Sequence, residues 1–415
     1  MGYYERFNPS KHLRNLKKSK RKIKLFLPSY MDKPGIFFPS LNGIRALAAS
    51  MVIVHHIEMV KSNVGMSVYR LPGDIGGLGV TLFFVLSGFL ITYLLLAEQQ
   101  QTGTIQIKNF YIRRILRIWP LYYLIVIISF FVFSQFIYHE GMAELQKHYW
   151  IKFVLNIFLM ANVSHACIGK VPLGSNLWSV GTEEQFYLIW PWLVMKLKNN
   201  GLTLLIAIMV ILGLSRILLS QYVYAGELEG TRRYLFFLLQ FLNLFRIDCM
   251  AMGALGAWIL FFKKEQILKI IFHKATQVIV WIACITSFVL GITYFDTMNH
   301  IFYSFFFIII LMNLAANKST MVSLENRVLN FLGKISYGLY VYHFIAVIVI
   351  LKLLNKYIQF ESTLIQNIVI YMSVFGLSIV ISGLSYRFVE KPLLKMKSRF
   401  TNIISGDAVN EKQNS

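Results

Sequence analysis

Three groups of polar residues have the side-chain chemistry of a catalytic or binding site, and each lies in or beside an apolar stretch of the chain. The first group contains Arg45 and His56, which are eleven residues apart. At 100° per residue they differ by only about 20° around a helix, with Asn42 near the same face and Glu58 nearly opposite. A neutral imidazole can accept a proton from a hydroxyl group. His56 is therefore either a general base or a core histidine whose ring nitrogens are satisfied by its neighbours.

The second group lies in the run Trp178–Tyr187, which contains Ser179 and the adjacent carboxylates Glu183 and Glu184 at the entry to a predicted membrane span. Two carboxylates at a helix start would complement the helix dipole, with a hydroxyl residue such as Ser179 as the N-cap. In the alternative interpretation, Glu183 lies at the same depth as His56, in the outer half of the membrane. It would then orient the imidazole for proton transfer.

The third group, Arg114 and Arg117, comes directly before a predicted span at 118–138. Residues three apart share a helical face. Guanidinium groups bind phosphate oxygens through paired hydrogen bonds, but basic residues also anchor the cytoplasmic ends of membrane helices. The pair is therefore either a phosphate site at the inner face or a topological anchor.

Membrane-spanning helices must position these groups. Of the 415 residues, 56% are hydrophobic and only 14% are charged, whereas a soluble domain has about a quarter charged residues. A spanning helix needs about 20 apolar residues. The pattern predicts an all-α polytopic membrane protein of one domain, with about ten transmembrane helices.

The predicted spans are 41–60, 78–97, 118–138, 184–198, 202–220, 235–262, 275–294, 300–316, 332–352 and 364–386. The sixth span carries Arg246 and Asp248 in its middle, so we expect it to be tilted or broken. These two residues are two apart and cannot pair along one helical face.

Basic residues outside the spans predict the orientation of the chain. Residues 1–24 are rich in Lys and Arg but lack the apolar core of a secretory signal, and the loops expected on the same side carry most of the remaining loop Lys and Arg. We expect a multi-pass protein of the plasma (inner) membrane with both termini in the cytoplasm. Residues 151–162 are too few for a comfortable span and are predicted to lie at the outer interface or to be re-entrant. The predicted parts are a basic cytoplasmic tail at 1–40, a transmembrane domain at 41–396 and a polar cytoplasmic tail at 397–415.

Composition excludes several classes of site and partner. The three cysteines have no CxxC spacing, which excludes a disulfide scaffold or a thiolate zinc site, and the nine histidines are scattered, so no metal site is expected. The basic residues flank apolar segments, so membrane lipids and not nucleic acid are the expected partners. Two weaker signals remain within spans. Ser87 and Gly88 favour close helix packing, and His343 is a mid-span histidine and so a functional candidate.

Several stretches of the chain resemble the acyltransferase 3 family of integral membrane O-acyltransferases, which typically modify surface carbohydrates. The matching stretches are Leu41–Ala46 through His56, Gly79–Phe89, Tyr111–Pro120, Trp178–Tyr187, Leu332–His343, and Arg387 with Glu390–Pro392. Together they extend from about 40 to 395 in the order that the family has.

The resemblance implies that His56 is the first-helix histidine of the family, thought to be catalytic, and that Glu183 is the glutamate of its WSL-type motif. The implied substrate-binding and acyl-CoA-binding residues are Arg45, Arg114, Arg117, Trp178 and Ser179. Asn42 and Thr81 stand where acidic residues are common. No esterase-like extension is seen, so no extracytoplasmic domain is expected to help hold the acceptor.

On this basis the expected activity is transfer of an acyl group, most simply acetyl, from cytoplasmic acyl-CoA to a hydroxyl of an extracytoplasmic glycan. The acceptor would be a cell-surface polysaccharide such as an O-antigen, or a lipid-linked glycan, and no bound cofactor is expected besides the acyl-CoA (acetyl-CoA) donor. Arg114 and Arg117 would hold the coenzyme phosphates and Arg45 the pantetheine arm or the remaining phosphate charge. His56 would act as general base, with Glu183 orienting it, or would carry the acyl group itself.

Two other functions use the same polar stripe. A transporter or flippase for a glycan or lipid-linked glycan would move its substrate without chemical change. A glycan polymerase would need a lipid-linked sugar donor. The absence of a visible internal repeat weakens the transporter interpretation, and neither alternative consumes acyl-CoA.

Overall fold

The computed structural model describes residues 35–69, 71–132, 146–196, 201–227, 229–293, 298–358, 362–401 and 403. Within these ranges the structure is helical and contains no β-strand, and residues 39–401 form one compact unit. The all-α prediction is confirmed. The predicted tails, and residues 133–138 of the third predicted span, lie mostly or wholly outside the described residues.

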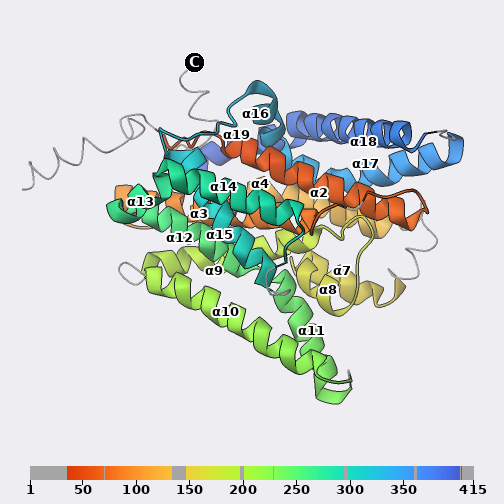
Figure 1. Ribbon diagram of the computed structural model, residues 1–415, viewed down its shortest axis with the longest axis horizontal. Coiled ribbons are helices and arrows are strands. Elements are labelled where there is room, and N and C mark those ends of the chain that lie inside the picture. The colour runs from red at the N-terminus through yellow and green to blue at the C-terminus, as the bar shows by residue number, and fades with distance from the viewer. Residues whose placement is uncertain are drawn as a thin grey trace, which may run out of the picture. The chain divides into compact units, whose positions relative to one another are not determined.

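The long helices are α2 (Leu41–Asn63), α3 (Ile75–Thr102), α4 (Ile107–Ile127), α9 (Leu177–Lys196), α10 (Gly201–Tyr224), α11 (Gly230–Leu244), α12 (Ile247–Phe261), α14 (Lys274–Val289), α15 (Asn299–Ala316), α17 (Ser336–Tyr357) and α18 (Thr363–Ser385). The shorter helices are α7 (Tyr149–Ile157), α8 (Ala161–Cys167), α13 (Glu265–Phe272), α16 (Arg327–Lys334) and α19 (Lys391–Lys397). Figure 1 shows their arrangement.

Eight of the described helical segments are long and apolar enough to cross a membrane, or nine if α13 and α14, which meet at 61°, form one bent span. The predicted fourth span corresponds to α9, which is not among them. Its 20 residues include Glu183, Glu184 and Gln185 in succession, which lower its mean hydropathy. A multi-pass membrane protein is confirmed, with fewer spans of ordinary composition than the ten predicted.

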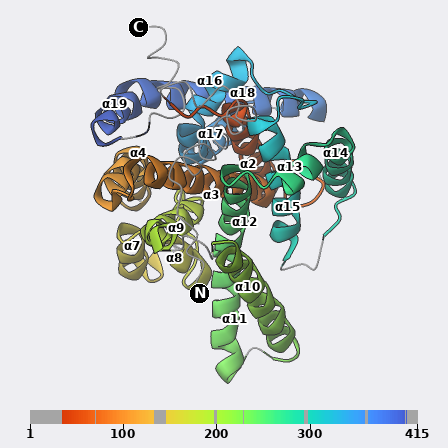
Figure 2. The same cartoon turned by 90° about the vertical axis from the view of Figure 1, so that its left-hand side faces the viewer.

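The sixth predicted span is broken, as its central charges suggested. Helix α11 ends at Leu244 and α12 begins at Ile247, with Arg246 as its N-cap residue. Figure 2 shows α10 beside α11, and α12 continuing from the end of α11. The break places Arg246 and Asp248 on different sides of the chain.

The apolar run at 151–162 forms two short helices. Helix α7 has nine residues and α8 has seven, so α7 is only about 13 Å long at 1.5 Å per residue. Neither is long enough to cross a hydrocarbon core of about 30 Å. The prediction that this segment does not span is confirmed.

Two close helix contacts fix the frame around the polar residues. Helix α3 crosses α12 where Gly88 faces Met250 and Gly253 faces Val85. A methyl group added at either glycine would lie 1.9 Å from the carbonyl oxygen of its partner. Helix α3 also packs along α2, and α17 packs against both α2 and α18. The predicted packing role of Gly88 is therefore confirmed.

Candidate active site

A pocket of about 430 Å³ lies beside His56. The residues that line it come mainly from α2, the start of α3, the segment joining α8 to α9, the break before α12, and α17. Figure 1 labels these helices. Its charged and ring-bearing lining residues are His55, His56, Asp74, His165, Lys170, Trp178, Arg246, Tyr340 and Phe344. The volume is within the usual range for small-ligand sites, roughly 300–1,000 Å³.

His56 forms a pair with a second histidine, His343 of α17. The Nδ1 atom of His56 lies 3.1 Å from Nε2 of His343 and 2.9 Å from the carbonyl oxygen of Val52. The Nδ1 atom of His343 lies 3.1 Å from the carbonyl oxygen of Leu339. His343 is completely buried. The mid-span histidine that the sequence marked only weakly is thus a direct neighbour of the proposed base.

These contacts determine which nitrogen of each ring carries the proton. A carbonyl oxygen only accepts, so Nδ1 of His343 must donate to Leu339, and Nε2 of the neutral ring is then an acceptor. Nδ1 of His56 faces two acceptors, the Val52 oxygen and that Nε2 atom, so it must carry the hydrogen. The Nε2 atom of neutral His56 is therefore left with a lone pair, which is what a general base requires.

The start of α3 packs against His55, which lines the same pocket. The Asp74 carboxylate accepts a hydrogen bond of 2.8 Å from the Gly77 backbone nitrogen and caps α3. Its oxygen lies 4.0 Å from Nδ1 of His55. Gly76 packs directly against the His55 ring, where an added methyl would lie 2.5 Å from the ring. The small residue lets α3 begin against the histidine-bearing face of α2.

Of the two residues predicted to bind substrate in this motif, Trp178 lines the pocket and Ser179 does not. The indole of Trp178 lines the pocket, and the Arg246 guanidinium lies 5.6 Å from its ring centre. Ser179 lies behind it, with its hydroxyl 2.6 Å from that of Tyr340. Ser179 thus joins α9 to α17 and does not cap α9, which begins at Leu177.

Glu183 is the seventh residue of α9, in its second turn, because the helix begins earlier than predicted. The helix-dipole effect is confined to the first turn, so the interpretation of Glu183 as a dipole-complementing end residue is wrong. Its carboxylate accepts a hydrogen bond from the Ser87 hydroxyl and also interacts with the Tyr187 hydroxyl. Glu183 belongs to a buried polar network with Ser87 and Tyr187.

Glu183 and His56 do not make the predicted contact among the described residues. Ser87, the partner of Glu183, is eleven residues along α3 from Gly76, which touches His55. That separation is about 16 Å at 1.5 Å per residue. Among the described residues, the ring in contact with Nδ1 of His56 is that of His343 on α17.

Arg114 and Arg117 lie within α4, not in a loop before it, because this helix begins at Ile107. The Arg114 guanidinium lies 5.6 Å from the ring centres of Phe110 and Tyr187. It also interacts electrostatically with Arg117 and with Glu184. The two arginines are part of the folded interior and not only of a loop that anchors topology.

Lys397 of α19 joins these arginines, and sequence reasoning missed it. Its ammonium group interacts with the guanidinium groups of Arg45, Arg113, Arg114 and Arg117. We call these five residues the inner cation cluster. Lys397 stood in a run of basic residues after Pro392 that resembled an ordinary cytoplasmic anchor, and only its position in the fold distinguishes it.

In the part of the chain that the structure describes, one member of the inner cation cluster, Arg114, has an unfilled hydrogen-bond donor, and the neighbouring carboxylates Glu184 and Glu390 each have an unfilled acceptor atom. The Nε atom of Arg114, Oε1 of Glu184 and Oε1 of Glu390 are buried without a hydrogen-bond partner among the described residues. Buried polar atoms in folded proteins are nearly always hydrogen-bonded. The unpaired Nε–H of Arg114 is a donor that an anionic oxygen could fill, whereas the unpaired carboxylate oxygens of Glu184 and Glu390 would need a donor.

Helix α2 connects the inner cation cluster to the His56 pocket. Arg45, which hydrogen-bonds Asn42 at 3.1 Å, and His56 lie on one continuous helix and on one face of it. The helical rise puts them about 16 Å apart. Glu58 is directed elsewhere, as predicted, and forms a buried ion pair of 2.8 Å with Lys61.

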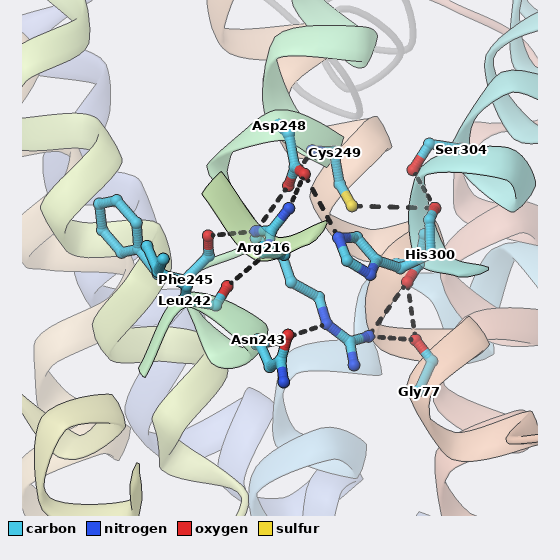
Figure 3. A network of polar contacts seen from close by, with 11 residues as sticks. Gly77, Arg216, Leu242, Asn243, Phe245, Asp248, Cys249, His300 and Ser304 are labelled. Carbon is cyan, nitrogen blue, oxygen red and sulfur yellow. Dashed lines mark hydrogen bonds and ion pairs between the residues drawn. The ribbon is translucent and has the colours of Figure 1, made fainter. Parts of the chain in front are cut away.

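One cluster has ligand atoms at metal-site spacing. Asp248, Cys249 and His300 each place one such atom within 4.8 Å of the others. However, Asp248 is already paired with the fully buried Arg216, which also donates to backbone carbonyls at the end of α11 (Figure 3). A metal cation would meet that guanidinium at close range. We therefore interpret the cluster as a buried ion pair that joins α10, α12 and α15.

The comparison with protein families finds one match over residues 38–387, to the acyltransferase domain of the acyltransferase 3 family. This range contains the His56 pocket, the polar network of Glu183 and four members of the inner cation cluster. The chain belongs to the acyltransferase 3 family. The resemblance drawn from the separate motifs is thereby confirmed over most of the chain.

Curated relatives of the chain are bacterial O-acetyltransferases. The peptidoglycan O-acetyltransferase OatA of Listeria monocytogenes is 27% identical over 388 residues, which cover 89% of this chain and 57% of the relative. A putative O-acetyltransferase of Staphylococcus aureus strain COL is 29% identical over 386 residues, 86% of this chain and 58% of the relative. The O-acetyltransferase OatA of Staphylococcus aureus is 27% identical over 401 residues, 91% of this chain and 59% of the relative.

The chain therefore spans less than three fifths of the length of these relatives. No solved structure matches it.

Proposed function

We propose that this chain transfers an acyl group, most simply acetyl, from cytoplasmic acyl-CoA to a hydroxyl group of a cell-surface glycan. The observation that carries the proposal is the His56–His343 pair, which leaves Nε2 of His56 as a base beside a ligand-sized pocket. The relatives named as O-acetyltransferases support acetyl as the acyl group and a peptidoglycan glycan as the acceptor.

The inner cation cluster is suited to the donor. Coenzyme A carries several phosphate charges, and arginine and lysine side chains bind phosphate through charge-assisted hydrogen bonds. With the phosphates at Arg45 and its neighbours, the extended pantetheine arm would have to bridge the roughly 16 Å to His56 along α2.

The chemical step follows from the ring assignments. Nε2 of His56 removes the proton of the glycan hydroxyl while the hydroxyl oxygen forms a bond to the thioester carbonyl carbon. The bond between that carbon and the coenzyme sulfur then breaks, and the thiolate leaves and takes up a proton from His56. While His56 is charged, its Nδ1 hydrogen remains shared with the Val52 oxygen and Nε2 of His343, which stabilises the imidazolium.

Replacement of His56 tests the base. His56→Gln and His56→Ala are expected to lower acetyl transfer to peptidoglycan fragments by roughly 10²- to 10⁴-fold in membranes with equal amounts of protein. The matched control is His273→Gln, which changes an exposed histidine between α13 and α14. Retained transfer in the His56 variants would remove this residue from the mechanism.

Sealed vesicles separate the enzyme from the transporter. The enzyme releases free coenzyme A from acetyl-CoA and increases the mass of the glycan. A transporter or flippase would move glycan into the vesicles without either change. The membership of the acyltransferase 3 family favours the first outcome.

Lys397 tests the donor site. Lys397→Gln is expected to raise the KM for acetyl-CoA roughly tenfold or more, since a hydrogen bond to a charged group is lost. S-acetylpantetheine lacks the coenzyme phosphates, so its use should not change. Lys395→Gln, an exposed position on the same helix, is the control. An equal loss with both donors would contradict phosphate binding by Lys397.

A further inference from the structure

Arg246 is a cation at membrane depth whose hydrogen-bond partners in the structure are all neutral. Its Nε donates to the Asn243 carbonyl oxygen at 3.0 Å, and its Nη1 to the Gly77 carbonyl oxygen at 3.2 Å and the Thr81 hydroxyl at 3.3 Å. It lies at the break between α11 and α12, over the ring of Trp178, and it lines the His56 pocket.

Three other cations inside the bundle have carboxylate partners. These pairs are Lys61 with Glu58, Arg113 with Glu98, and Arg216 with Asp248. Among the residues that the structure describes, none provides a carboxylate within ion-pair distance of Arg246. Asp248, two residues away, is occupied by Arg216 and by His300 (Figure 3). A charged group without a counter-ion at this depth is costly, and such residues commonly belong to a substrate path.

The pocket beside Arg246 contains a second cation. Lys170 lines it from the segment between α8 and α9, and its charge acts on both His56 and His165. Asp74 is the acidic residue of the lining, but its carboxylate caps α3 through Gly77 and lies beside His55. With neutral histidines, the two cations and the one carboxylate of the lining leave the pocket with a formal charge of +1, and no carboxylate among the described residues is paired with Arg246.

We propose that the acceptor glycan carries an anionic group, a carboxylate or a phosphate, which Arg246 and Lys170 bind in the His56 pocket. The guanidinium fork matches a pair of anionic oxygens, and the indole of Trp178 offers an apolar face to the sugar ring. The sugar hydroxyl then faces His56. This inference rests on the proposed function and adds to it the charge class of the acceptor.

Binding can be measured without any transfer reaction. The full chain in neutral detergent is heated with glucuronate, glucose 6-phosphate or glucose, since a ligand that binds only the folded state raises the midpoint of unfolding. We expect one or both charged sugars to raise the Tm and glucose to leave it unchanged, and the stronger anion identifies the preferred group. Equal shifts with all three sugars, or no shift with either charged sugar at tens of millimolar, would overturn the proposal.

Variants locate the anion site. Arg246→Gln should abolish the shift in Tm that the charged sugars cause, and Arg246→Lys should keep part of it. Lys170→Gln should reduce the shift without abolishing it, because Lys170 is exposed and solvent screens its charge. Arg233→Gln, an exposed arginine of α11 away from the pocket lining, should keep the whole shift. An unchanged shift in Arg246→Gln would exclude this residue as the anion site.

The transfer reaction then tests the consequence for the acceptor. Peptidoglycan fragments are offered with their carboxylates free or converted to methyl amides. We expect the wild-type kcat/KM to favour the free carboxylates by roughly 10- to 100-fold, the factor for a charged hydrogen bond, and Arg246→Gln to remove this preference. Equal use of both forms would overturn the inference while leaving acyl transfer intact. Transfer to neither form would count against the proposed function, and the sugar-binding result would still decide the anion site.

Discussion

His56 obtains its reactive tautomer from a residue on another helix. Because Nε2 of His343 accepts from Nδ1 of His56, the free nitrogen of His56 is the one that can act as a base. We predict that His343→Leu, which has no acceptor, lowers kcat by roughly 10- to 100-fold, less than the roughly 10²- to 10⁴-fold expected for loss of the base, because the His56 imidazole itself is still present. His343→Gln keeps an acceptor oxygen and should retain more activity. Wild-type kcat in His343→Leu, at equal protein amounts, would contradict the role of this pair.

His165, at the edge of the same pocket, makes stability depend on pH. Burial, together with the nearby Lys170 ammonium, lowers the pKa of His165 to about 4, from an ordinary value of 6.5. The unfolded chain therefore binds this proton more readily than the folded chain, so stability is lost as the pH falls from 6.5 toward 4.

We predict that the Tm of His165→Gln falls less between pH 7 and pH 4.5 than the Tm of the wild-type protein. The measurement is thermal unfolding of the purified protein at several pH values. Parallel curves for the two proteins would show that His165 is not responsible.

At the scale of helices, the crossing of α3 and α12 depends on the absence of side chains. Gly88 and Gly253 each face a backbone carbonyl at a distance that excludes a methyl group. Gly88→Val or Gly253→Val should therefore destabilise the protein by about 1–3 kcal/mol or more.

Gly376 of α18 provides the control for this prediction, because a methyl group there meets nothing within 4 Å. Gly376→Ala should leave the Tm unchanged or raise it, since alanine favours a helix by up to about 1 kcal/mol. The two classes of variant are compared by thermal unfolding. Similar effects in both would indicate a general sensitivity of these helices to substitution, and the crossing would not be the cause.

At the scale of the whole molecule, Cys167 reports the orientation of the chain in the membrane. It is exposed at the end of α8, whereas Cys249 and Cys284 are buried. The predicted positive-inside arrangement would place this segment outside the cell. We predict that a membrane-impermeant maleimide labels intact cells at Cys167, and that Cys167→Ser removes the label. Because burial raises the pKa of the Cys167 thiol, labelling should be carried out above neutral pH. Labelling only after permeabilisation would show that Cys167 faces the cytoplasm and would contradict the predicted topology.

Local sequence was sufficient for the properties that depend on one helix at a time. Apolar length predicted the multi-pass helical fold, and the charges at Arg246 and Asp248 predicted the break in the sixth span. Helical periodicity put Arg45 and His56 on one face of α2. Apolar length also kept the short run at 151–162 from being counted as a span. Each of these follows from spacing within a single segment.

Tertiary structure alone decided which faces meet. Nothing in the spacing of α2 and α17 predicted that His343 would touch His56, or that Glu183 would accept a hydrogen bond from Ser87 of α3. Spacing within a single helix also could not predict that Lys397, near the C-terminal end of the chain, would lie close to Arg45 of α2. The physical reason is that periodicity orients a side chain about its own axis. The order in which helices pack, and how far each is shifted along its neighbour, depends on contacts between residues hundreds of positions apart.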